Sequence, residues 1–188
     1  MVPVVSLAIP ILLSAVFVFI ASSIIHMVLP IHRNDFRKLS DEDNVMEALR
    51  RFKIAPGDYL MPAPGSPAAM KDPAFLAKRD KGPIVVMTVL PPGPPSMGMN
   101  LVQWFLYSVL VSVFAAYIAG RALGPGAHYL EVFRFAGASA FMGYSLGLIP
   151  QSIWFKKAWS STIKSVVDGL VYALLTAGTF GWLWPVNP

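Results

Sequence analysis

Two histidines and a carboxylate stand close together in the stretch "HMVLPIHRND". His26 and His32 flank Pro30, and Asp35 follows shortly after the second histidine. Imidazole nitrogens and carboxylate oxygens are common metal ligands, so these residue types suggest a metal site. Six residues along a regular helix turn the two rings about 240° apart, so they converge only if the helix breaks at Pro30. We therefore name His26 and His32 as the metal candidates on this condition, and we predict no bound cofactor.

A second candidate site lies at the start of the last apolar segment, where Asp168 follows Lys164 by four residues. This spacing places both side chains on one face of a helix, where they can form an ion pair. An acidic residue in a membrane helix is also a candidate ion or proton site. We favour the structural pair, because Asp168 lies only about one turn inside the segment and Lys164 can extend its ammonium group to water.

A third pair, Glu131 and Arg134, opens another apolar segment. The two residues are three apart and can pair on a helix, and Arg121 is close enough in sequence to join them. An interfacial salt bridge is the favoured interpretation, and a substrate-binding rim is the alternative. A haem held by two histidines is not expected, because His128 belongs to the opposite membrane face in the topology derived below.

Several other kinds of chemistry are excluded by residue type or by missing motifs. The chain has 0 cysteines, which excludes disulfides, thiolate metal sites and a cysteine nucleophile. It contains no P-loop, Gly-x-Ser-x-Gly, His-Glu-x-x-His or Gly-x-Gly-x-x-Gly motif. The net charge of +5 is not gathered on a basic face with aromatic residues, so it does not indicate nucleic-acid binding.

The composition is typical of a membrane protein, with 55% hydrophobic residues, 13% charged residues and a mean hydropathy of +0.59. The apolar residues form runs long enough to cross ~30 Å of hydrocarbon at ~1.5 Å per residue. A signal peptide is the competing interpretation of the first run, but that run lacks a basic start and is too long. We predict an all-α, polytopic protein with four transmembrane helices, at residues 1–30, 101–120, 131–154 and 162–185.

The distribution of basic residues predicts the orientation of these helices. Thirteen of the 15 lysines and arginines lie in or beside the links that follow the first and third helices. The other two, Arg121 and Arg134, lie towards the opposite side. Because basic loops stay in the cytoplasm, we expect loops 31–100 and 155–162 to be cytoplasmic and both termini to lie outside.

The long loop, residues 31–100, is rich in proline, which favours extended chain. The segment "PIVVMTVL" offers a strand, but a single strand has no edge to pair with. We therefore expect an ordered loop with little regular structure, and disorder is the alternative. The exception is a short amphipathic helix at 41–53, capped by Ser40. Its apolar face contains Val45, Met46, Leu49 and Phe52.

Small residues recur at every fourth position in the second, third and fourth helices. In lipid, helices associate through close van der Waals packing, which small side chains permit. Packing within the chain is the favoured interpretation, and one stripe left free for a partner is the alternative. The stripes are Ser108, Ser112, Ala116 and Gly120; Ser139, Gly143 and Gly147; and Gly169, Ala173, Ala177 and Gly181.

Few ionisable groups within the spans, three packing stripes and a proline-rich loop indicate a non-catalytic accessory, assembly or scaffold subunit of a membrane complex or homo-oligomer. Its expected partners are the lipid bilayer and either other membrane subunits or further copies of itself. One alternative is a metal-dependent membrane enzyme near His26 and His32. The other is a small oligomeric transporter or channel that uses Asp168. Its further polar lining would be Ser139, Ser145, Thr176 and Thr179.

Overall fold

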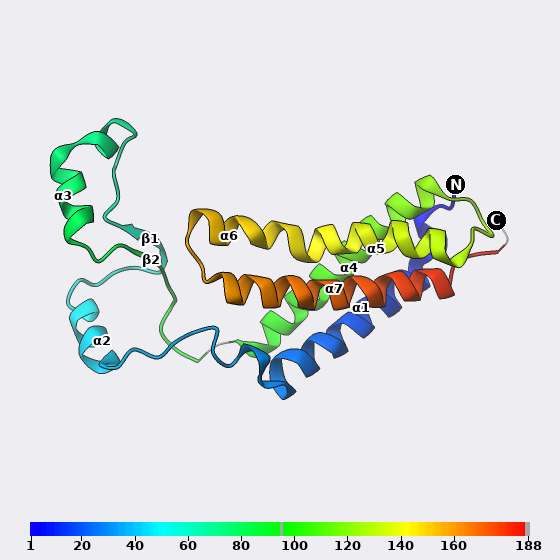
Figure 1. Ribbon diagram of the computed structural model, residues 1–188. Helices are drawn as coiled ribbons and strands as arrows, with labels where there is room; N and C mark the ends of the chain where they lie inside the picture. The colour runs from blue at the N-terminus through cyan, green and yellow to red at the C-terminus, as the bar shows by residue number, and fades with distance from the viewer. Residues whose placement is uncertain (95, 187–188) are drawn as a thin grey trace. The chain divides into compact units, whose positions relative to one another are not determined.

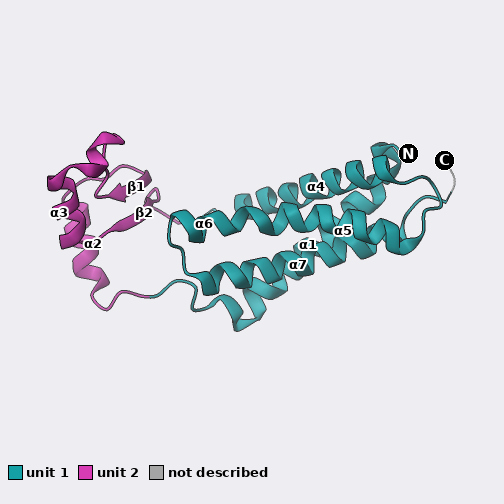
Figure 2. Cartoon of the chain, turned by 45° about the horizontal axis from the view of Figure 1, so that its top comes forward, with its two compact units in different colours: residues 1–37, 96–188 teal, residues 38–95 magenta. Residues whose placement is uncertain are grey.

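The computed structural model describes residues 1–94 and 96–186, and the chain divides into two compact units (Figure 2). Unit 1 consists of residues 1–37 and 96–188, and it contains the apolar helices. Unit 2 consists of residues 38–95, which are inserted between the first and second of these helices.

Among the described residues, four helices are long and apolar enough to cross a membrane, and each overlaps one of the four predicted spans. The predicted mostly helical fold is therefore confirmed, and the four long apolar helices are compatible with an integral membrane protein. The candidate spans are Val4–Val28, which contains α1 (Ala8–Ser23); Met97–Ala122, which is α4; Tyr129–Trp154, which contains α5 (Tyr129–Ser145) and α6 (Ile149–Trp154); and Trp159–Trp182, which is α7.

The four spans of unit 1 form a bundle in which successive spans run in opposite directions (Figure 1). α1 packs against α4 and α7, and α5 packs against the same two helices, with α5 and α7 in the most extensive contact. Short links force this arrangement, because only residues 123–128 join α4 to α5 and only residues 155–158 join α6 to α7.

The interior of the bundle consists of two clusters, one in each half of its length. One cluster surrounds Leu7, Val132 and Phe180, and all three side chains are fully buried. The other contains Tyr144 and Tyr172, whose ring centroids lie 5.5 Å apart in an edge-to-face arrangement. The larger side chains fill the space that alanine and serine leave at the helix contacts.

Several residues of the small-residue stripes lie where two helices, or a helix and the N-terminal segment, approach closely. Gly169 of α7 faces Tyr144 and Ser145 of α5, and Gly120 of α4 faces the carbonyl of Val2. Gly147 is different, because a Cβ there would have no neighbour within 4 Å. Gly143 faces Val111, Gly181 faces Tyr129, and Ser108, Ser112, Ala116, Ser139, Ala173 and Ala177 are buried.

Unit 2 contains more regular structure than its proline content suggests. The amphipathic helix α2 (Glu42–Arg50) falls within the predicted range 41–53. Beyond it lie strand β1 (Gly57–Met61), helix α3 (Pro73–Lys81) and strand β2 (Val85–Val89). β1 and β2 pair antiparallel, with Gly57 opposite Val89 and Met61 opposite Val85.

The expectation of little regular structure in this loop is therefore wrong. The predicted strand "PIVVMTVL" contains β2 and has a pairing partner, which is the short strand Gly57–Met61. Helix α3 also had a sequence signal. Asp72 accepts a hydrogen bond from the Ala74 amide as an N-cap, and Pro73 occupies the first helical position.

The close approach at Gly169 predicts that a larger side chain will destabilise the bundle. A Cβ at this position would meet the Ser145 hydroxyl and lie 3.1 Å from the Tyr144 Cβ. We expect Gly169→Val to lower the free energy of unfolding by ~2 kcal/mol or more, because α5 and α7 must separate. Thermal unfolding in detergent, followed by helical circular dichroism, measures the change.

Gly98→Val is the matched control, because Gly98 lies in α4 and a Cβ there has no neighbour within 4 Å. Equal losses of stability in the two variants would contradict a packing role for Gly169.

Candidate functional site

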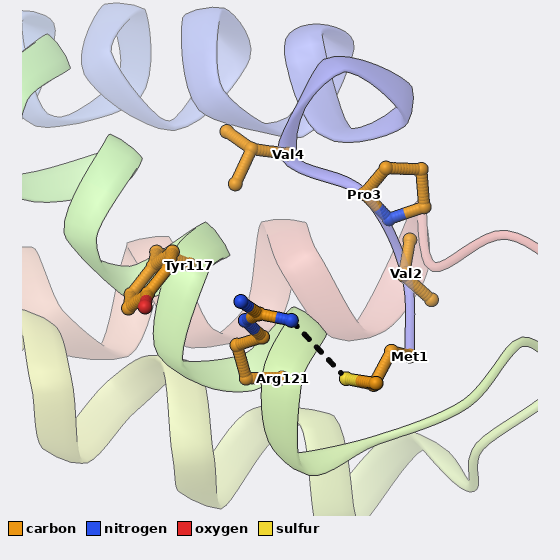
Figure 3. A pocket seen from close by; sticks show the side chains of 6 residues that line it. All are labelled: Met1, Val2, Pro3, Val4, Tyr117 and Arg121. Carbon is orange, nitrogen blue, oxygen red and sulfur yellow. Dashed lines mark hydrogen bonds between the residues drawn. The ribbon is translucent and has the colours of Figure 1, made fainter.

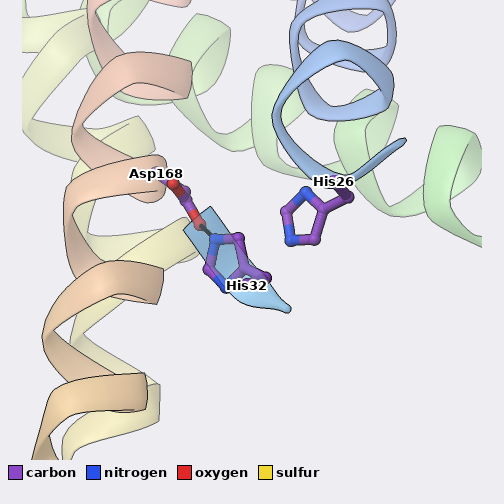
Figure 4. Close-up of side chains that lie close together, drawn as sticks. All are labelled: His26, His32 and Asp168. Atoms are coloured by element: carbon purple, nitrogen blue, oxygen red, sulfur yellow. Dashed lines mark ion pairs between the residues drawn. The ribbon is translucent and has the colours of Figure 1, made fainter. Parts of the chain in front are cut away.

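The first candidate span ends in a break that brings its two histidines together. After α1 comes a π-helical turn, Ile24–Val28, and Leu29 is then extended with ψ of 141°. Pro30 causes this change, because it has no backbone N–H and disfavours a helical residue before it. The rings of His26 and His32 therefore stack, with centroids 4.6 Å apart and planes 6° from parallel (Figure 4).

His32 lies between two carboxylates. Its Nδ1 is 2.6 Å from Asp35 Oδ2. Its Nε2 is 2.8 Å from Asp168 Oδ2, the ion pair drawn in Figure 4. A carboxylate only accepts hydrogen bonds when ionised, so Nδ1 carries the proton that it donates to Asp35. Nε2 is buried and has no hydrogen bond of good geometry among the described residues, although the Asp168 oxygen is close.

Lys164 binds the second carboxylate oxygen of Asp35, the one that does not contact His32. Its Nζ donates to Asp35 Oδ1 at 2.8 Å and to the Ile31 carbonyl at 2.8 Å. The hydrogen bond from Lys164, followed by that from His32, lowers the pKa of the Asp35 carboxyl to about 2. Asp35 is therefore ionised at neutral pH and holds both a histidine and a lysine.

This arrangement replaces the ion pair that the sequence predicted between Lys164 and Asp168. Although these two residues share a helix, Lys164 pairs with Asp35 among the described residues, and Asp168 faces His32. The reason is the break at Pro30, which places Asp35 against α7 within reach of the lysine.

His26 is held by its own helix. Its Nδ1 lies 3.0 Å from the carbonyl oxygen of Ser22, which can only accept a hydrogen bond. The proton of a neutral ring therefore belongs on Nδ1, and Nε2 keeps its lone pair. The hydroxyl of Ser22 accepts a hydrogen bond from Trp104 Nε1 at 2.8 Å, which connects this end of the first span to α4.

Three of these residues together offer a set of metal ligands. His26, His32 and Asp168 each contribute one ligand atom, and the three atoms lie within 4.8 Å of one another. The sequence suggested Asp35 as the carboxylate of such a site. In the structure Asp35 instead hydrogen-bonds His32, and Asp168 from the far end of the chain takes its place. Of these contacts, only the one between His32 and Asp35 had a sequence signal, which is their spacing of three residues.

Glu131 and Arg134 do not form the predicted salt bridge. Glu131 Oε2 accepts from the His128 backbone amide at 3.2 Å, and His128 Nδ1 accepts from the Leu130 amide at 3.3 Å. This is a capping box, which satisfies free amides at the start of α5. Arg134 is exposed and, among the described residues, makes no ion pair.

Arg121 does not join these residues either. It lines a hollow of about 310 Å³ beside the N-terminal residues (Figure 3). Its guanidinium carbon lies 5.7 Å from the centroid of the Tyr117 ring, and one of its nitrogens is 3.4 Å from the Met1 sulfur. These contacts attach the N-terminal segment to the end of α4.

Comparison with protein-family models, with curated proteins and with solved structures finds no match for this chain.

The position of Lys164 predicts that it orders the segment after the first span. In Lys164→Met, Asp35 and the Ile31 carbonyl lose their donor. We expect a loss of about 1–2 kcal/mol of stability, which is the size of a charge-assisted hydrogen bond with partial exposure. Hydrogen exchange should also accelerate at the Arg33 and Asp35 amides, which are bonded within this segment.

Lys157→Met is the control, because Lys157 is exposed and lies in the link before α7. If both variants exchanged as slowly as the unmodified chain at these amides, Lys164 would not order this segment.

Proposed function

We propose that the chain is a non-catalytic, membrane-anchored accessory, assembly or scaffold subunit that binds partner subunits through unit 2. One observation carries the proposal. Among residues 38–94 only Phe75 is buried, and even this side chain is 9% exposed. A unit of this size normally buries an apolar core. Unit 2 has hardly any core, so its apolar side chains remain exposed unless another surface packs against them. A partner subunit would supply that surface.

A hollow of about 420 Å³ on unit 2 supports this proposal, because it offers a candidate surface for a partner segment. It is lined by residues of α2, of the segment after α2 and of the end of β2, and most of them are apolar. The two basic side chains of the lining favour a partner segment that combines apolar and acidic residues. The apolar lining is Met46, Leu49, Ile54, Met87, Val89 and Leu90, and the basic residues are Arg50 and Lys53.

The transporter or channel alternative has less support, because most of its expected lining is bonded locally. The hydroxyls of Ser139, Thr176 and Thr179 each donate to the carbonyl four residues earlier in the same helix. Ser145 differs, because it donates to the Val166 carbonyl of α7 at 3.3 Å. These bonds satisfy the hydroxyls within lipid without forming a polar path.

We further propose that unit 2 is cytoplasmic, because most basic residues lie in it or in the links on its side of the bundle. The absence of native cysteine makes this simple to test with single cysteines. Ala77 in α3 and Ala122 at the end of α4 are both exposed. A membrane-impermeant maleimide applied to intact cells should label Ala122→Cys and leave Ala77→Cys unlabelled until the cells are lysed. The reverse pattern would show the opposite orientation.

The partner itself can be sought by extracting the chain from its native membrane in mild detergent. Native mass spectrometry with peptide identification should show other polypeptides, or further copies of this chain, in a fixed ratio. We expect Leu49→Asp to reduce that occupancy at least tenfold, because a charge buried against an apolar partner costs roughly 1.4 kcal/mol or more.

Ala48→Asp introduces the same charge at the adjacent exposed position of α2, which does not line the hollow. It should keep the partner. A bare monomer in every extract would refute the subunit proposal, and equal losses in both variants would remove the hollow as the binding surface.

A further inference from the structure

The residues at the break of the first span have the composition of a metal site and part of its supporting structure. We propose that His26, His32 and Asp168 bind one divalent first-row transition metal ion, for which Zn²⁺ is the representative. The ligand atoms come from two segments, the end of the first span and α7, and they lie within 4.8 Å of one another. The proposal does not depend on the partner subunit described above.

The hydrogen bonds around the histidines are those that a metal site requires. A histidine ligand usually donates its other ring N–H to a carboxylate or carbonyl, which fixes the tautomer and orients the ring. His32 does this through Asp35, and His26 does it through the Ser22 carbonyl. In both rings the Nε2 lone pair is left for a metal.

The close approach of His32 Nε2 to Asp168 Oδ2 is the strongest single indication. The two atoms lie 2.8 Å apart, and Nε2 is buried without a well-directed hydrogen bond among the described residues. Both are ligand atoms of the types that a transition metal binds, and at this separation one ion can bind both. Lys164 holds Asp35 from the opposite side, so the support for His32 is itself fixed.

Binding requires one ring to move. The stacked rings are nearly parallel, so their in-plane lone pairs do not meet at one point. His26 is the ring that turns, because it is exposed and only its Nδ1 is bonded, whereas His32 contacts carboxylates at both nitrogens.

The ligand types determine the class of ion. Two imidazoles and one carboxylate suit zinc, iron, nickel and cobalt, whereas magnesium and calcium prefer oxygen ligands alone. Three protein ligands leave at least one coordination position for water. The ion would also join the segment that leads into unit 2 to α7 by coordinate bonds, in addition to the existing contacts with Asp35 and Lys164.

The test is the zinc content of the full chain, purified in detergent with a tag that contains no histidine. After incubation with Zn²⁺ and desalting, elemental analysis should find one Zn²⁺ per chain. Zn²⁺ should also raise the unfolding temperature of the unmodified protein. His26→Asn and His32→Asn should lose stoichiometric binding. Asp35→Asn should weaken the affinity about 10- to 100-fold, as expected for a supporting carboxylate.

His128→Asn is the matched control, since His128 is the third histidine of the chain and asparagine can replace it as a helix cap. It should bind zinc as the unmodified chain does. X-ray absorption at the zinc edge should show nitrogen and oxygen ligands that include imidazole.

Three results would overturn the proposal. The first is a folded, unmodified chain that retains no Zn²⁺, in which case the cluster is an ion-pair network alone. The second is undiminished zinc in the His26→Asn and His32→Asn double variant. The third is a zinc-edge spectrum without imidazole. The unmodified chain decides the first result, so misfolding of a variant cannot obscure it.

Discussion

The contact between Asp35 and Lys164 is the interaction on which the arrangement at this end of the bundle depends. It fastens the segment after the first span to α7, and the two charges bond at 2.8 Å. His32 is placed by the same carboxylate, and through His32 the segment also reaches Asp168. Lys164 lies near the start of α7 and its side chain is 31% exposed, so its ammonium group can remain partly solvated. A charge here costs less than one at the bilayer centre, which explains why so polar a cluster can belong to so apolar a bundle.

The remainder of unit 1 follows a different rule, because lipid offers no hydrogen-bond partners to its interior. Small residues bring α5 and α7 close together, and several buried hydroxyls, such as those of Ser108, Ser139 and Thr176, bond to carbonyls of their own helices. Ser112 and Tyr172 are exceptions, with buried hydroxyls that lack a partner among the described residues. Interhelical hydrogen bonds, such as those from Trp104 to Ser22 and from Ser145 to the Val166 carbonyl, therefore supplement the van der Waals packing of small side chains.

The four spans could be predicted from sequence because an apolar run of sufficient length carries its own signal. The cluster could not, since Lys164 and Asp35 are 129 residues apart and no local pattern selects one carboxylate over another. The approach of His26 to His32 could be predicted only on the condition that the helix breaks at Pro30, because a regular helix would turn the two rings apart. Strand β1 could not be predicted for a related reason. Its sequence "GDYLM" is short and begins with Gly and Asp, which are uncommon in strands, so only its pairing with β2 makes it a strand.

The distance along the chain between the two halves of the cluster has a consequence for biosynthesis. A ribosome that adds ~5–20 residues per second needs on the order of ten seconds to travel from Asp35 to Lys164. During that interval unit 2 is synthesised, and His32 and Asp35 have no α7 to bind. The cluster therefore closes only when the last span has entered the membrane. The presence of these contacts therefore distinguishes a completed bundle from one that still lacks α7.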